Sequence, residues 1–376
     1  MTVAGLIFSN IHDSAIPELT NRRTMASVPF GCRYRLVDFP ISNMVNSGIT
    51  KVGIITHNNY QSLMDHIGTG KDWDLARRSG GIKIIPPFIT AYENSAAARL
   101  YSTRLEALMG AFGFISRCTE EYIAFSDCDG ICNIDLSDVL KAHEKNDADI
   151  TIVTRRISPG DDVSQSMYIV SSDDKGEITD VSAYRPSDVP VQISTNIMVM
   201  KRTFLMNMIS DAEAHGYTDF YRDIICRNCG RYRMYSYIYD GFYIMITSLA
   251  SYFSASMKLL DADMRNGLFN VRNRPIYTKV RNSSPTIYSE KADVKNSYVA
   301  DGCIIDGKVE NSILFRGVHI GKGTVVRNSV LLQDTFTGDD VMLNCVISDK
   351  NVVIKNGRML SGHETMPFFL SKGTIV

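Results

Sequence analysis

The stretch VENSILFRGVHIGKGTVVRNSV, residues 309–330, carries the repeat that decides the fold of the C-terminal part of the chain. Its two Asn-Ser pairs belong to a longer series, because Asn-Ser or Asn-Cys recurs every 15 to 17 residues, at 296, 311, 328 and 344. Within that frame an apolar residue returns at every sixth position, as at Ile320, Val326 and Leu332. This spacing is typical of a parallel β-helix built from hexapeptide rungs. The pattern predicts such a β-helix over residues 286–376, with an irregular all-β sandwich as the alternative.

Upstream of residue 263 the pattern of apolar residues is different. Short apolar runs at 3–8, 51–57, 81–87, 121–127 and 148–156 indicate buried strands, and helix-like segments such as 58–67 and 97–112 lie between them. Alternating strands and helices predict an α/β domain over residues 1–262, of the Rossmann-like, mononucleotide-binding kind with a mostly parallel sheet. The loops after Phe8, His57, Pro87 and Phe125 are then expected around one crevice. Residues 263–285, rich in Asn, Arg and Pro, are expected to form a linker.

Bulk composition excludes several classes of protein. The 376 residues carry a formal net charge of −1, so no bulk attraction to nucleic acid or to an acidic membrane is expected. No apolar run approaches the roughly 18 residues of a membrane span. The eight cysteines are scattered over both parts of the chain, which favours reduced thiols and a cytoplasmic location.

Three motifs carry a resemblance to a known family. They are VPFGCRYRLVDFPISNMVNSGI at 28–49, HIGTGKDWDLARRSGG at 66–81, and the repeat at 309–330. Together they resemble the glucose-1-phosphate adenylyltransferases, which make ADP-glucose for glycogen synthesis from ATP and glucose 1-phosphate. The resemblance extends over nearly the whole chain and implies that the β-helix is left-handed.

The resemblance also identifies what is missing from the phosphate loop. Active members carry a glycine-rich loop after the first strand, where backbone N–H groups approach the triphosphate and cations balance its charge. The glycine positions fall here on Asn10, Ile11 and Asp13, the loop arginine on Ala15, and the following lysine on Met25. Asp13 is expected to set a negative charge beside any bound polyphosphate.

The metal positions of the family are half retained. The first metal aspartate corresponds to Asp129, which forms a DxD pattern with Asp127. The second corresponds to Met245, whose thioether is a poor ligand for a hard cation. Asp129 is therefore predicted to be at most a weak metal ligand, and Mg²⁺ is expected as a cofactor only if the chain is active.

The sugar-phosphate side is less altered. Arg185 stands at the position of a substrate-binding lysine, and Ser194 and Asp219 match further substrate positions of the family. Asn196 replaces a glycine and is expected to narrow the pocket. Ordinary surface roles for Arg185 and Asp219 remain an alternative.

Three arginines match a regulatory anion site of the family, namely Arg22, Arg23 and Arg35. Guanidinium groups suit phosphate or sulfate because they bind in a bidentate way. Salt bridges at a subunit interface are the alternative role.

Because the substitutions are concentrated on the reaction centre, the leading hypothesis is a GlgD-type subunit. Such a chain would be catalytically impaired and would modulate an active adenylyltransferase subunit in a hetero-oligomer, expected to be a tetramer. A slow but genuine adenylyltransferase is the second hypothesis, and a sugar-phosphate or nucleotide sensor without an enzymatic partner is the third. None of the three calls for nucleic acid or membrane as a partner.

Overall fold

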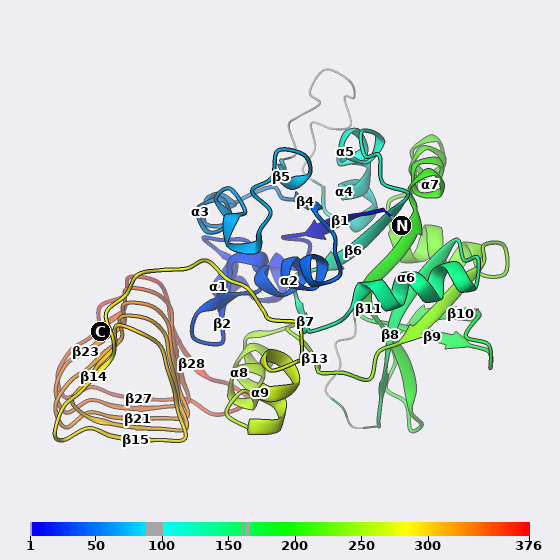
Figure 1. Ribbon diagram of the computed structural model, residues 1–376. Helices are drawn as coiled ribbons and strands as arrows, with labels where there is room; N and C mark the ends of the chain where they lie inside the picture. The colour runs from blue at the N-terminus through cyan, green and yellow to red at the C-terminus, as the bar shows by residue number, and fades with distance from the viewer. Residues whose placement is uncertain (1, 87–100, 160, 162–165) are drawn as a thin grey trace.

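The computed structural model describes residues 2–86, 101–159, 161 and 166–376. Figure 1 shows them as an α/β domain with a triangular stack of short strands beside it. In the described part of the chain, no helix combines the length and apolar character that crossing a membrane requires.

A nine-stranded sheet forms the centre of the α/β domain, with β10-β9-β11-β6-β1-β4-β5 in spatial order, β8 beside β11 and β12 beside β8. Its strands are β1 (Val3–Phe8), β4 (Lys51–Ile55), β5 (Gly81–Ile85), β6 (Tyr122–Asp127), β8 (Ile150–Ile157), β9 (Tyr168–Ser172), β10 (Ile178–Ala183), β11 (Val191–Lys201) and β12 (Met234–Ile238). Strands β6, β1, β4 and β5 run parallel, as the alternating pattern predicted, whereas β11 is antiparallel to its neighbours β6, β8 and β9. The expected end of the third run, Pro87, lies outside the described residues.

Both faces of this sheet are buried. On β1, Ile7 packs into one hydrophobic cluster, while Leu6 and Phe8 pack into another on the opposite face. Burial on both faces explains why these strands appear in the sequence as continuous apolar runs. The helices are α1 (Pro17–Thr20), α2 (Asp38–Asn46), α3 (Gln61–Ile67), α4 (Arg104–Gly110), α5 (Phe112–Ser116), α6 (Leu136–Lys145), α7 (Arg202–Ala214), α8 (Leu249–Lys258) and α9 (Ala262–Phe269).

Two helix boundaries differ from the sequence prediction. The helix expected over 97–112 begins only at Arg104, because Thr103 and Glu106 form a capping box there; residues 97–100 lie outside the described part. The segment expected to be a linker from 263 instead begins inside helix α9, which Asp261 caps by accepting from the N–H groups of Asp263 and Met264. Gly267 in the middle of α9 weakens its helical signal.

The C-terminal part is a left-handed β-helix, as expected, made of three parallel five-stranded sheets. The first contains β14 (Ile287–Tyr288), β17 (Ile304–Ile305), β20 (His319–Ile320), β23 (Phe336–Thr337) and β26 (Val353–Ile354). The second contains β15 (Asp293–Lys295), β18 (Lys308–Glu310), β21 (Val325–Arg327), β24 (Met342–Asn344) and β27 (Met359–Ser361). The third contains β16 (Tyr298–Val299), β19 (Ile313–Leu314), β22 (Val330–Leu331), β25 (Val346–Ser348) and β28 (Phe368–Leu370).

The Asn-Ser repeat marks one corner of each coil. Asn296, Asn311 and Asn328 have φ of 43°, 46° and 44°, in the left-handed region that asparagine tolerates better than most residues. Their side chains continue the stacking, since Asn296 Nδ2 donates to Asn311 Oδ1 at 2.7 Å. Strands of successive coils pair in parallel, as Val309 with Val326 and Val326 with Leu343, so the sandwich alternative is wrong.

The third sheet of the β-helix packs against the α/β domain. Along β19, Leu314 points into the core of the β-helix, whereas Ile313 and the following Phe315 join the hydrophobic cluster of the α/β domain. A buried ion pair also crosses this boundary, with Arg23 Nη2 2.7 Å from Asp349 Oδ2. Two small strand pairs complete the α/β domain: β2 (Pro29–Phe30) with β3 (Tyr34–Arg35), and β7 (Gly130–Cys132) with β13 (Tyr243–Met245).

Candidate functional site

The loop after β1 is held by its own hydrogen bonds. The Asp13 carboxylate accepts from the backbone N–H of Met25 at 2.6 Å. Burial raises the pKa of Asp13 to about 7, although that hydrogen bond and His12 oppose the rise. Asn10 is fixed in turn, because Tyr101 donates to its Oδ1 at 2.9 Å. Residues 9–16 all have negative φ, so this loop has a conformation that needs no glycine.

The two aspartates at the end of β6 hold a histidine from that loop. His12 Nε2 lies 2.8 Å from Asp127 Oδ2 and 3.5 Å from Asp129 Oδ2, and both carboxylates are buried. The guanidinium of Arg104, at the start of α4, donates to the same Asp127 oxygen. The predicted meeting of the first and fourth loops at one crevice is therefore confirmed. Sequence reasoning missed His12 and Arg104, the two cations found there.

These contacts set the charges of the cluster. Burial alone would lower the pKa of His12, but the carboxylates of Asp129 and Asp127 outweigh it and raise the pKa to about 9. Burial acts upward on Asp127, yet Arg104 and His12 hold its pKa below the ordinary value. For Asp129, burial raises the pKa to about 6, with His12 opposing and Asp127 adding to the rise. Two buried carboxyl groups are thus matched by one buried cation, Arg104, and one half-buried cation, His12.

Met245, which the sequence predicts at the second metal position, lies beside this cluster. Met245 on β13 pairs with Gly130 on β7, and the N–H of Ile246 donates to the carbonyl of Asp129 at 2.9 Å. The strand pairing therefore places residue 245 next to Asp129, but the side chain there is a thioether. Mg²⁺ requires hard oxygen ligands in near-octahedral geometry. With Met245 at one position and Asp127 and Asp129 contacting His12, the residues present do not fit that ion.

Tyr221 contacts Ser194, one of the predicted substrate residues. Its hydroxyl lies 2.6 Å from Ser194 Oγ and donates to Asn196 Oδ1 at 2.9 Å. The ring of Tyr168 stacks on Tyr221 at 4.0 Å, and the Arg104 guanidinium lies 5.6 Å from the Tyr221 ring centre. A continuous buried network therefore connects the acid pair to the strand that bears Ser194. Tyr221 directly follows the segment Thr218–Asp219–Phe220, but no spacing in the sequence indicated this role.

The predicted substrate residues are distributed differently. Ser194 belongs to the network just described. Asp219 caps the short helical segment Phe220–Ile225, with its Oδ1 accepting from the N–H of Arg222 at 2.7 Å. Arg185 is exposed in the connection between β10 and β11.

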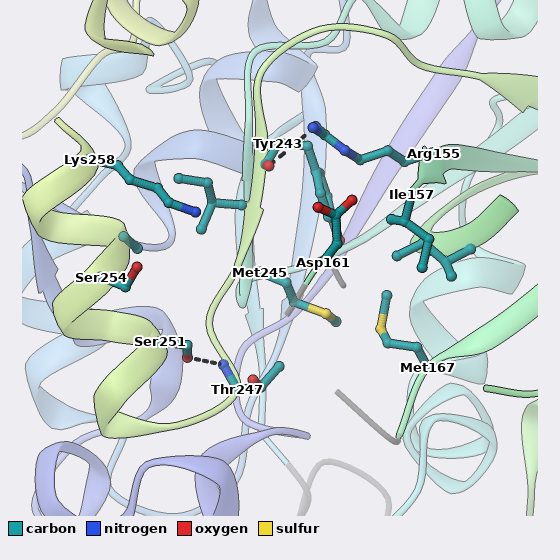
Figure 2. Close-up of a pocket in the computed structure, with 13 residues that line it drawn as sticks. Arg155, Ile157, Asp161, Met167, Tyr243, Met245, Thr247, Ser251, Ser254 and Lys258 are labelled. Atoms are coloured by element: carbon teal, nitrogen blue, oxygen red, sulfur yellow. Dashed lines mark hydrogen bonds between the residues drawn. The ribbon is translucent and has the colours of Figure 1, made fainter. Parts of the chain in front are cut away.

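A cavity of about 210 Å³ lies on the Met245 side of β13 (Figure 2). Arg155 and Lys258 approach it from opposite sides, and Met167 and Met245 supply apolar surface between them. Arg155 is partly engaged, since its Nη1 donates to the carbonyls of Gly241 and Tyr243 at 3.1 and 3.2 Å. The cavity borders Met245, and its lining combines charged and apolar side chains.

A second cavity, of about 390 Å³, lies between the two domains and is strongly basic. Its lining contains seven arginine and lysine side chains and one aspartate: Arg33, Arg35, Lys279, Arg281, Arg316, Lys350, Lys372 and Asp334. Burial, together with Arg35 and Arg23, lowers the pKa of Lys350 to about 7. Arg316 pairs with Asp301 at 3.0 Å, and the other lining cations still outnumber the one lining aspartate, which favours an anion.

The three predicted regulatory arginines have three different environments. Arg35 lines the basic cavity, where its Nη1 also donates to Ser62 Oγ at 3.0 Å. Arg23 is buried, and Asp349 accepts from it with both oxygens. Arg22 is exposed. The salt-bridge alternative thus describes Arg23, within one chain rather than between subunits.

Comparison with known proteins agrees with this architecture. The nucleotidyl transferase family matches residues 16–262, and the GlmU-like, C-terminal hexapeptide family matches residues 284–366. The chain is 33% identical to the glycogen biosynthesis protein GlgD of Bacillus subtilis (strain 168), over 99% of this chain and 96% of that protein. It is 35% identical to GlgD of Geobacillus stearothermophilus, over the same shares. Identity to the glucose-1-phosphate adenylyltransferase of Clostridium perfringens (strain SM101 / Type A) is 30%, over 89% of this chain and 85% of that enzyme.

Proposed function

Because this chain belongs to the nucleotidyltransferase family of the glucose-1-phosphate adenylyltransferases and the GlgD proteins, we propose that it acts in glycogen synthesis as a GlgD-type subunit. It has little or no adenylyltransferase activity of its own and modulates an active partner subunit in a hetero-oligomer. The observation that supports this proposal best is the acid pair, which is engaged by His12 and Arg104 instead of being open to Mg²⁺ and ATP.

The pattern of retained and lost features supports a modulating role over a merely defective enzyme. The interface between the domains is intact, with a shared hydrophobic cluster and a buried ion pair. The basic cavity at that interface supports binding of a phosphorylated effector, with Arg35 and Lys350 among its cations. A chain with this cavity can respond to an anion without performing the reaction.

The test compares the purified chain with a mixed preparation. The chain alone, given ATP, Mg²⁺ and glucose 1-phosphate, is expected to release little diphosphate. Co-expression with an adenylyltransferase subunit that has an intact glycine loop is expected to yield a complex whose activity or effector response differs from that of the partner alone. Since each lost transition-state contact costs about 3 kcal/mol, turnover by the chain alone above about a tenth of the partner's would contradict the proposal and favour the slow enzyme.

The basic cavity also favours a second candidate, a sugar-phosphate or nucleotide sensor without an enzymatic partner. The two candidates differ in one measurement. A sensor is stabilised by its ligand in the absence of any other subunit, and pull-down from its native cell recovers no adenylyltransferase. Recovery of a stoichiometric adenylyltransferase subunit supports the modulating role instead.

A further inference from the structure

The position of His12 has a consequence beyond the proposed function. We propose that the His12 side chain takes the place of a divalent metal ion. The negative charge of Asp127 and Asp129 is then compensated by cations of the chain itself, and the two carboxylates bind no Mg²⁺. The proposal concerns the chemistry of this site alone and does not depend on the existence of a partner subunit.

Space is the first argument. The Nε2 atom of His12 and one oxygen each of Asp127 and Asp129 lie within 4.8 Å of one another. An ion bridging the two carboxylates would need both oxygens at about 2.0–2.1 Å, within the volume that the imidazole now occupies. The Asp127 oxygen that contacts His12, Oδ2, also accepts from Arg104, so this one oxygen already has two partners.

Charge is the second argument. Asp127 and Asp129 are each 2% exposed, and a buried carboxylate requires a compensating partner. His12 and Arg104 supply that compensation, and an added divalent ion would leave the cluster with excess positive charge. The two carboxylates therefore need no metal ion to compensate their charge.

Both cations are also held in place, His12 by the loop after β1 and Arg104 by helix α4. The loop bearing His12 is fixed on either side, at Asn10 by Tyr101 and at Asp13 by the N–H of Met25. Arg104 is the first residue of α4, after the Thr103 cap. The glycine-free loop is thus what brings residue 12 onto the acid pair.

The competing arrangement uses the same three side chains as ligands. One nitrogen and two carboxylate oxygens are donors that Zn²⁺ accepts, and His12 would then bind the ion instead of replacing it. The two arrangements predict opposite effects of removing the imidazole.

The experiment titrates the full chain with Mn²⁺, as a surrogate for Mg²⁺, and with Zn²⁺. Bound Mn²⁺ is measured by electron paramagnetic resonance, and the melting temperature is followed with each ion. The wild-type chain is expected to show no saturable site and no shift with either ion. His12→Ala is expected to gain one Mn²⁺ site, at least about tenfold tighter than any wild-type binding, because the imidazole no longer fills the ion's position.

Two controls assign the gained site. His12→Ala combined with Asp129→Asn is expected to lose the gained site. His57→Ala removes a half-buried histidine that contacts Tyr101 beside the crevice, and it is expected to gain none. Saturable binding of either ion by the wild-type chain that His12→Ala weakens would overturn the proposal, as would a folded His12→Ala chain without a gained site. The wild-type titration is decisive even where the variant does not fold, and none of these measurements requires a partner or a substrate.

Discussion

The acid-pair cluster and the basic cavity use cations in opposite ways. In the acid-pair cluster His12 and Arg104 contact Asp127, with Asp129 beside them, so positive and negative groups are equal in number. In the basic cavity seven arginine and lysine side chains share the lining with one aspartate. A balanced buried cluster has no need of a ligand, whereas an unbalanced one gains stability from an anion.

The two sites also differ in where their contacts come from. The acid pair is contacted by residues of the α/β domain, from His12 through Arg104 to Tyr221. The basic cavity is formed where the α/β domain, the segment after α9 and the β-helix meet, so an anion bound there contacts both domains. Substitutions at the two sites should therefore show equal numbers of positive and negative groups at the acid pair and an excess of cations in the basic cavity.

The largest effect is expected from breaking the balanced cluster. Asp127→Ala leaves the buried Arg104 and the half-buried His12 with one carboxylate fewer, and removing one partner of the buried Arg104–Asp127 ion pair costs about 3 to 5 kcal/mol of unfolding free energy. Denaturant unfolding measures the loss. Asp138→Ala, which removes an exposed partner of Lys141, is the matched control and should leave the midpoint unchanged. Equal midpoints for the two variants would show that the cluster is not a stabilising ion-pair network.

A smaller loss is expected at the domain boundary. Asp349→Ala leaves Arg23 buried near Lys350 without its partner, which should lower the unfolding free energy by about 3 kcal/mol. Arg23→Ala should also destabilise the chain, while Arg22→Ala at the exposed neighbour should not. Thermal unfolding of the three variants checks this order. If Arg23→Ala and Arg22→Ala behave alike, Arg23 is not the structural link inferred from the ion pair.

Much of the fold could be predicted from sequence because its signals are local. The apolar run of β1 was placed at its observed bounds, and the Asn-Ser spacing predicted the strand offset of the β-helix. Each of these depends on neighbouring residues or on a fixed repeat. Helix α9 was missed because its eight residues include Gly267 and bury only Leu268.

The candidate site was harder to predict, for a physical reason. His12 and Asp127 are 115 residues apart, and Arg23 and Asp349 are 326 apart, so no local pattern records either pairing. The resemblance to the family predicts that ligands are missing at Ala15, Met25 and Met245, and this stays a prediction. It could not predict what replaced them, because His12 and Tyr221 act through tertiary contacts. The role of Arg23 likewise depends on a carboxylate in the other domain.

The smallest predicted effect tests the unbalanced cavity through pH. Lys350 is flanked by Arg35, Arg23 and Arg281, with Asp349 as the opposing charge, and burial with these cations lowers its pKa to about 7. Between about pH 7 and its ordinary pKa the unfolded chain therefore binds more protons at this lysine than the folded chain does. Its contribution to stability rises with pH across that window and is least favourable below it.

Comparison with Lys350→Met isolates this contribution from other groups that titrate in the same range. From pH 7 to pH 9, the unfolding free energy of the wild type is expected to rise relative to that of Lys350→Met. Inorganic phosphate should reduce that change, because an anion in the cavity raises the pKa of Lys350 toward its ordinary value. Urea unfolding at pH 7, 8 and 9, with and without phosphate, measures both effects. A difference that is constant with pH would mean that the cations around Lys350 are already balanced, and the contrast between the two sites would fail.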